Sequence, residues 1–82
     1  MNEVRRAALE QLAEMQKAAL AQIDKLLAAE RQDVSDLPDN IEESDFASRV
    51  LKRPMFELSL ARCHLLESIG HIASAVLKDS EL

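Results

Sequence analysis

The sequence has very little of the material from which turns are made. Its 82 residues include one glycine and two prolines. Antiparallel sheets need Gly, Asn or Pro in almost every hairpin, so most β architectures are excluded. Aromatic residues are also scarce, with two Phe and no Trp or Tyr. Collagen-like and Pro/Gly-rich disordered chains are excluded by the same counts.

The chain also lacks a disulfide framework and any long apolar run. A single cysteine cannot form an internal disulfide. No apolar run exceeds four residues, whereas a transmembrane helix needs about 20. The first residues do not contain the apolar stretch of a signal peptide. We therefore expect a cytoplasmic protein that neither contains a disulfide nor enters a membrane.

What remains is a composition typical of a small helical protein. Hydrophobic residues make up 48% of the chain and charged residues 30%, which is too apolar for a disordered chain. The length suits one domain, residues 1–82. The net charge of −5 is concentrated in residues 34–45, which hold five acids and no Lys or Arg: Asp36, Asp39, Glu42, Glu43 and Asp45.

This acidic segment excludes some partners and leaves two interpretations open. A net acidic chain without a basic face does not favour direct binding of nucleic acid. The segment is either a solvated acidic loop or an acidic tip directed at a basic or metal-containing partner.

The first predicted helix covers about residues 3–32, where there is no Gly or Pro, with Asn2 as its N-cap. Two rows with the alternating four-three spacing of a coiled coil run along it. We take the first row as the seam, with Met15 in the core: Ala8, Leu12, Met15, Ala19, Gln22, Leu26 and Ala29. The second row lies beside it: Leu9, Ala13, Gln16, Leu20, Ile23 and Leu27.

The second predicted helix begins near residue 41 or 45 and runs to about residue 78. Its seam has the same spacing: Ala47, Leu51, Pro54, Leu58, Ala61, Leu65, Ser68, Ile72 and Ala75. A proline inside a helix costs about 3 kcal/mol. Either a short helix ends at Arg53 and a long one begins at Pro54, or one helix is kinked there. The spacing keeps its phase across Pro54, which favours the kinked helix; Met55 and Phe56 beside it are candidates for exposed apolar residues.

Together these elements predict an all-α fold, an antiparallel helical hairpin of the coiled-coil type with an acidic tip at about residues 34–45. One hairpin cannot bury every apolar row. We expect a second copy, making a dimeric four-helix bundle, or a further domain to cover the remaining apolar residues. The predicted apolar interface contains Leu9, Leu20, Ile23, Leu66, Ile69 and Val76.

Few residues could support catalysis or metal binding. His64, Glu67 and His71 share one helix face, but the two histidines are about 10 Å apart along the axis, too far for one metal ion. Cys63 has no Cys partner and no feature that would make it acidic. We therefore expect no enzyme activity, no catalytic residues, no metal and no cofactor.

The tip carries a short motif. Residues 37–39 are Leu-Pro-Asp and residues 42–47 are Glu-Glu-Ser-Asp-Phe-Ala. This segment resembles the tip of the coiled-coil domain of the DksA/TraR family of bacterial transcription regulators, whose motif is Asp-x-x-Asp-x-Ala. Asp45 and Ala47 match its last two positions, and Glu42 stands where the first Asp would be.

The resemblance continues more weakly along the chain. Residues 57–58 and 65–69 resemble the family's returning helix, while the family's four-cysteine zinc finger has no counterpart in this sequence. The resemblance implies a protein that inserts its acidic tip into the secondary channel of RNA polymerase and alters open-complex stability. Glu42, Asp45 and Ala47 would carry this activity, and five uncompensated acids suit a positively charged channel.

A second interpretation belongs to a different class. The chain would be a homodimeric helical-hairpin adaptor or a small chaperone, which binds a partner helix through its apolar stripe. A third is that it is a coiled-coil piece of a larger protein.

Overall fold

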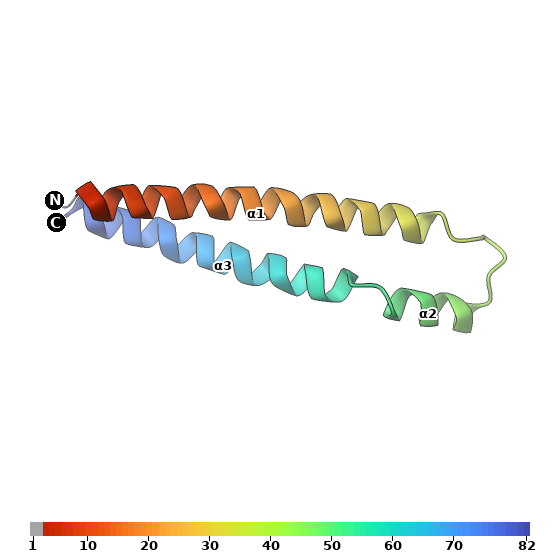
Figure 1. Ribbon diagram of the computed structural model, residues 1–82. Helices are drawn as coiled ribbons and strands as arrows, with labels where there is room; N and C mark the ends of the chain where they lie inside the picture. Colours follow the sequence, from red (N-terminus) through yellow and green to blue (C-terminus); the bar gives the residue numbers. More distant parts are fainter. Residues whose placement is uncertain (1–2) are drawn as a thin grey trace.

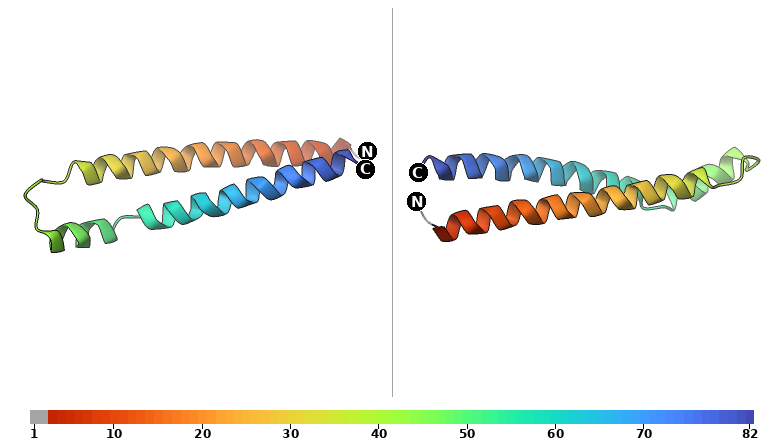
Figure 2. Two further views of the ribbon diagram at one scale, coloured as in Figure 1. Left: turned by 180° about the vertical axis from the view of Figure 1, so that it is seen from behind. Right: turned by 90° about the horizontal axis from the view of Figure 1, so that it is seen from above.

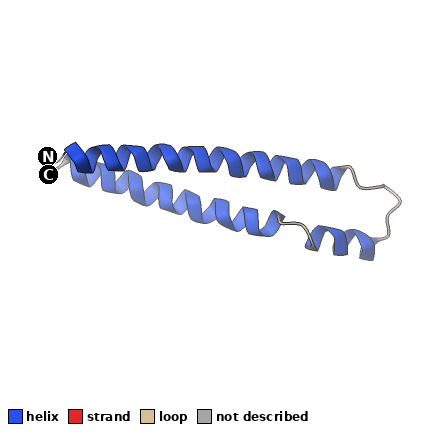
Figure 3. Cartoon of the chain, in the orientation of Figure 1, coloured by secondary structure: helices blue, strands red, loops and turns tan. Residues whose placement is uncertain are grey.

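The structure, a computed structural model, describes residues 3–82 and contains three helices (Figure 1). They are α1 (Glu3–Ser35), α2 (Glu43–Leu51) and α3 (Met55–Ser80). Figure 3 shows that short loops join the helices and that the described residues contain no strand. The all-α prediction is confirmed, while Asn2, the predicted N-cap, lies outside the described residues.

Helices α1 and α3 lie side by side and run in opposite directions, so that both chain ends lie at one end of the molecule (Figure 2). Two ion pairs join these helices, Arg5 with Asp79 and Asp24 with Arg62, and a third joins Glu30 of α1 to Arg53 in the segment before α3. The molecule is a rod of 62 × 15 × 14 Å.

The first helix continues three residues beyond its predicted end and stops at Ser35. Pro38 disfavours helical geometry at Leu37, so the chain leaves the helix there. The backbone N–H groups of Asp36 and Leu37 still donate to the carbonyls of Gln32 and Val34, at 2.9 and 3.2 Å. These bonds complete the last turn before the chain crosses to α2.

The helix is interrupted around Pro54, and the prediction of a kinked continuous helix is wrong. Helix α2 ends at Leu51 and α3 begins at Met55. Pro54 has no N–H to donate to the carbonyl of Val50, and this carbonyl instead accepts from the N–H of Arg53 at 3.1 Å. The carbonyl of Pro54 then accepts from Leu58 at 2.9 Å and starts α3. The unbroken spacing of apolar residues could not reveal this change of hydrogen bonding.

The structure also corrects which row of α1 faces α3. Met15 and Leu26, in the predicted seam, are 60% and 52% exposed. The row beside it is the covered one, and all its members are buried or half-buried: Leu9, Ala13, Gln16, Leu20, Ile23 and Leu27. The covered row carries four large aliphatic side chains, three Leu and one Ile, whereas the predicted seam carries three large apolar side chains, two Leu and one Met. Packing the covered row against α3 therefore removes more apolar area from water.

The covered row of α3 agrees with its prediction in part, because Leu58, Leu65, Ile72 and Ala75 of the predicted seam are half-buried. Ala61 and Ser68 of the predicted seam are exposed. The positions that are half-buried in their place are Arg62 and Ile69, and the resulting row keeps the four-three spacing.

The interior between α1 and α3 is narrow. Among the described residues, Leu27 is the only buried hydrophobic side chain, at 4% exposure. Two polar side chains are buried as well: Gln16 donates from Nε2 to Ser68 Oγ at 2.7 Å, and Asp79 pairs with Arg5 at 2.7 Å. Such partners are what allow buried polar groups to be tolerated. Within residues 3–82, no helix is long and apolar enough to cross a membrane.

Candidate functional site

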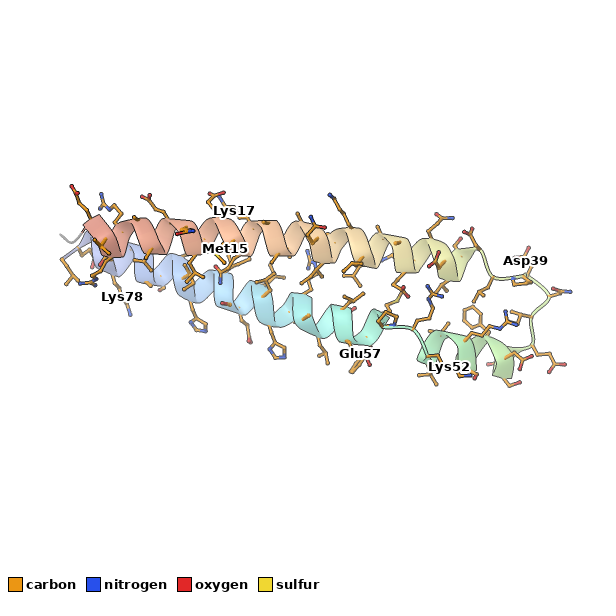
Figure 4. All side chains as sticks on the ribbon, in the orientation of Figure 1. Met15, Lys17, Asp39, Lys52, Glu57 and Lys78 are labelled. Atoms are coloured by element: carbon orange, nitrogen blue, oxygen red, sulfur yellow. The ribbon has the colours of Figure 1, made fainter. Side chains whose placement is uncertain are left out.

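The acidic segment forms the end of the rod opposite to the chain termini, where Figure 4 labels Asp39. Asp36 and Asp39 lie in the loop before α2, and Glu43 and Asp45 lie in the first turn of α2. Carboxylates are favourable there because the amino-terminal end of a helix carries partial positive charge. Glu42 stands at the N-cap with φ −65° and ψ 147°, and its side chain makes no capping hydrogen bond.

The charge of this tip is not neutralised within the described chain. None of its five carboxylates is in an ion pair among residues 3–82. Asp36 accepts one hydrogen bond from Gln32 Nε2, at 2.9 Å. The tip, defined as Asp36, Asp39, Glu42, Glu43 and Asp45, therefore presents a concentrated negative potential at one end of the molecule.

The structure brings together two of the three predicted tip residues. Glu42 and Asp45 are three positions apart at the start of α2 and lie about one turn from each other. Ala47 follows Asp45 by two positions, which turns it about 200° around the helix. Ala47 is exposed, but it lies on a different face of α2 from Asp45.

Apolar side chains support the tip from inside. Val34, Leu37, Pro38, Ile41 and Phe46 line a hollow of about 360 Å³ between the end of α1 and the start of α2. Val34, Leu37 and Ile41 are half-buried. Ser35, Asp39 and Glu43 line the same hollow, so apolar side chains and tip carboxylates share it.

Two strongly exposed apolar residues lie beside the break between α2 and α3. Leu51 is 84% exposed and Phe56 is 69% exposed. They line a groove of about 470 Å³ together with Val50 and Met55. Phe56 was predicted as an exposed apolar residue and is one; Met55 is half-buried.

Arg53 ties the break to α1, an interaction that the sequence did not suggest. Its Nε donates to Glu30 Oε2 at 2.6 Å, and its Nη2 donates to Glu30 Oε1 at 3.0 Å and to Asp33 Oδ2 at 2.6 Å. The hydrogen bond with Glu30 is the main cause that raises the pKa of Arg53 above its ordinary value. In the sequence, the only sign of this interaction is that Glu30 and Asp33 lie about one turn apart on α1. Their partner can be identified only when the pairing of the helices is known.

Residues considered for chemistry are dispersed on the surface. His64 Nδ1 lies 3.7 Å from Glu67 Oε2, and Cys63 is exposed. Over the described part of the chain, no three His, Cys, Asp or Glu side chains lie close enough to hold a metal ion.

The six residues of the predicted apolar interface do not lie on one exposed surface. Leu9, Leu20, Ile23 and Ile69 are half-buried in the rows that α1 and α3 present to each other. Only Leu66 and Val76 of this set are exposed. At the end with the termini, a cavity of about 540 Å³ opens between the helices, with Ala8, Leu12, Ala75 and Leu82 in its lining.

A scan against models of known protein families, a search of curated proteins and a search of solved structures each found no match to this chain. The resemblance of the tip to the DksA/TraR family stays a prediction.

Proposed function

We propose that this protein is a helical hairpin that acts by binding another protein through its acidic tip and performs no catalysis. One observation carries this proposal. Five carboxylates, none in an ion pair with another described residue, are gathered at one end of a rod 62 Å long. The two long helices then serve as a spacer that holds the charge away from the chain termini.

The chemistry of the tip selects the kind of partner. A cluster of like charges without counter-charges is drawn to a positively charged surface, and this attraction raises the rate and specificity of encounter. The ion pairs that α1 makes with α3 and with the segment before it use the acids of the shaft, such as Asp24 and Glu30. The tip acids remain available for a basic partner.

RNA polymerase is the partner that we test first, because the tip resembles that of the DksA/TraR regulators. By this resemblance, the tip enters the secondary channel of a bacterial polymerase in the cytoplasm and alters open-complex stability. Asp45 is the residue on which the activity depends most, with Glu42 beside it. Ala47, on another face of α2, contributes through shape instead of charge.

The test compares two variants with the wild type in a pull-down from bacterial lysate, followed by transcription with purified polymerase. The tip variant is Asp45→Asn/Ala47→Thr. The matched control is Glu10→Gln, which removes one exposed acid from the shaft. We expect the tip variant to lose its effect on a promoter with an unstable open complex, while the control behaves as the wild type. Wild-type protein that does not bind polymerase excludes this partner, and a tip variant that captures every wild-type partner excludes the tip itself.

A second candidate function, the adaptor or small chaperone, is favoured by a separate observation. Twelve large hydrophobic side chains are exposed among the described residues, against one that is buried. Leu66 and Leu77, both exposed, lie on the same flank of α3. If the protein is an adaptor, Leu66→Glu/Leu77→Glu should abolish partner capture, and Asp45→Asn should leave it intact.

A further inference from the structure

One face of the α1–α3 pair is apolar across both helices. We call it the open face, and it consists of Ala8, Leu12, Met15, Ala19, Gln22, Leu26 and Ala29 of α1 with Ala61, Ser68 and Ala75 of α3. The row of α1 is turned by about 100° from the row that faces α3. The cavity lined by Ala8, Leu12 and Ala75 spans both helices, so the two halves of the face adjoin at the end with the chain termini.

We propose that a second copy of this chain covers the open face in the antiparallel sense, forming a four-helix bundle with the two acidic tips at opposite ends. This inference is independent of the partner proposed for the tip. In the dimer, the second copy covers the apolar residues that the α1–α3 pair leaves exposed to water.

The pattern of the face indicates that its occupant is a helix. The α1 row keeps strict four-three spacing from residue 8 to residue 29, a length of about 32 Å. Such a row packs against another helix by knobs-into-holes contacts. In a four-helix bundle each helix contacts two neighbours, and the two rows of α1 provide these two contacts. The small side chains of Ala61, Ser68 and Ala75 leave room for the second copy to approach α3.

The face is complementary to itself when the copies are antiparallel. With the two-fold axis near residues 20–21, Met15 lies opposite Leu26 of the second copy, and Leu12 lies opposite its Ala29. Met15 and Leu26 thus form the apolar layers of the contact, Leu12 meets a small side chain, and Ala19 lies opposite Gln22. A parallel pair would place Ala against Ala and Leu against Leu, leaving alternate gaps and crowding.

Charge favours the same orientation. Parallel copies would bring two tips, each with five acids, to the same end, where they repel each other. Antiparallel copies keep the tips apart by the length of the rod. They also bring Glu14 of one copy to within about 3 Å, along the helix axis, of Lys25 of the other.

The interior of a single copy is also too small. Leu27 is the only buried hydrophobic side chain among the described residues, and chains of this size seldom gain enough stability from one small core. Covering Leu12, Met15 and Leu26 extends the core along most of α1. In the antiparallel dimer, each tip lies beside the termini of the second copy and is therefore part of a four-helix rod. A channel of the partner that admits only two helices would bind the monomer.

The first experiment measures the mass of the full chain by sedimentation equilibrium. We expect twice 9.2 kDa for the wild type and 9.2 kDa for Met15→Glu, together with a lower melting temperature, because the monomer keeps only the small core between α1 and α3. The matched control Leu77→Glu alters an exposed leucine on the opposite side of the pair and should remain a dimer. A folded wild-type monomer, a larger assembly, or a dimer that survives Met15→Glu overturns the proposal.

The second experiment tests the orientation by disulfide formation in a Cys63→Ser background. A mixture of Met15→Cys and Leu26→Cys chains should form a crosslink between the two different chains. Met15→Cys alone should crosslink poorly, and efficient crosslinking of Met15→Cys with itself would overturn the antiparallel arrangement. Asp45→Asn should leave the dimer unchanged, so failure of the tip proposal and failure of the dimer are distinguishable.

Discussion

The two ends of the molecule are held together by different forces. Along the shaft, α1 packs against α3, and cross-helix ion pairs flank the apolar row. At the tip, α2 has no comparable packing against α1, and Arg53 is the polar link between the break and α1. Several carboxylates of the shaft are thus held in ion pairs, whereas none of the tip carboxylates is in one among residues 3–82. The difference indicates that substitutions at the two ends should separate stability from function.

The largest effect is expected from Leu27→Ala in the shaft. Leu27 is the one hydrophobic side chain that is buried within residues 3–82. Its removal leaves a cavity between α1 and α3, and such changes cost about 2–5 kcal/mol. Leu77→Ala, at a leucine that is 66% exposed, is the control and should cost far less. Urea denaturation followed by circular dichroism measures both. Equal losses for the two variants would mean that the α1–α3 row does not carry the stability of the rod.

An intermediate effect is expected from Arg53→Ala at the joint between shaft and tip. The change removes three hydrogen bonds to carboxylates and leaves Glu30, which is largely buried, without its partner. Because Asp33 and Arg53 are partly exposed and solvent weakens such pairs, we expect a loss of stability smaller than that of Leu27→Ala but measurable.

Hydrogen exchange locates that loss. Amides of α2 should exchange faster in Arg53→Ala, while those in the middle of α1 and α3 change little, because the joint holds α2 and not the shaft. Arg49→Ala, an exposed arginine of α2, is the control. Uniformly faster exchange along the whole rod would contradict the role of Arg53 as a local joint.

The smallest effect on stability is expected from Asp45→Asn at the tip. Asp45 is exposed and in no ion pair among the described residues, so its loss should change the free energy of unfolding by less than about 1 kcal/mol. Thermal denaturation measures this. A larger loss would show that the tip carboxylates support the fold, and the separation between shaft and tip would fail.

Some features of the tip follow from neighbouring residues in the sequence, and others do not. The position of the acidic segment and the proximity of Glu42 to Asp45 follow from residues that are neighbours in the chain. The clamp of Arg53 on Glu30 and Asp33 was not predictable in this way, because it joins residues at least 20 positions apart. The break at Pro54 was predictable in part. The sequence allowed either a kinked helix or two separate helices, and the structure has two, with the N–H of Arg53 bonded to the carbonyl of Val50.

By itself, the sequence determined that the chain is helical, that it reverses near Pro38 and that its excess charge lies at the reversal. These properties depend on the scarcity of Gly and Pro, on the geometry that proline imposes and on counting charges, all of which are local. Only the tertiary structure decided which row of α1 packs against α3. Both rows have the same four-three spacing, so periodicity cannot rank them. The choice is made where the rows meet α3, because the row with Leu9, Leu20, Ile23 and Leu27 buries more apolar area and lets Gln16 bond to Ser68.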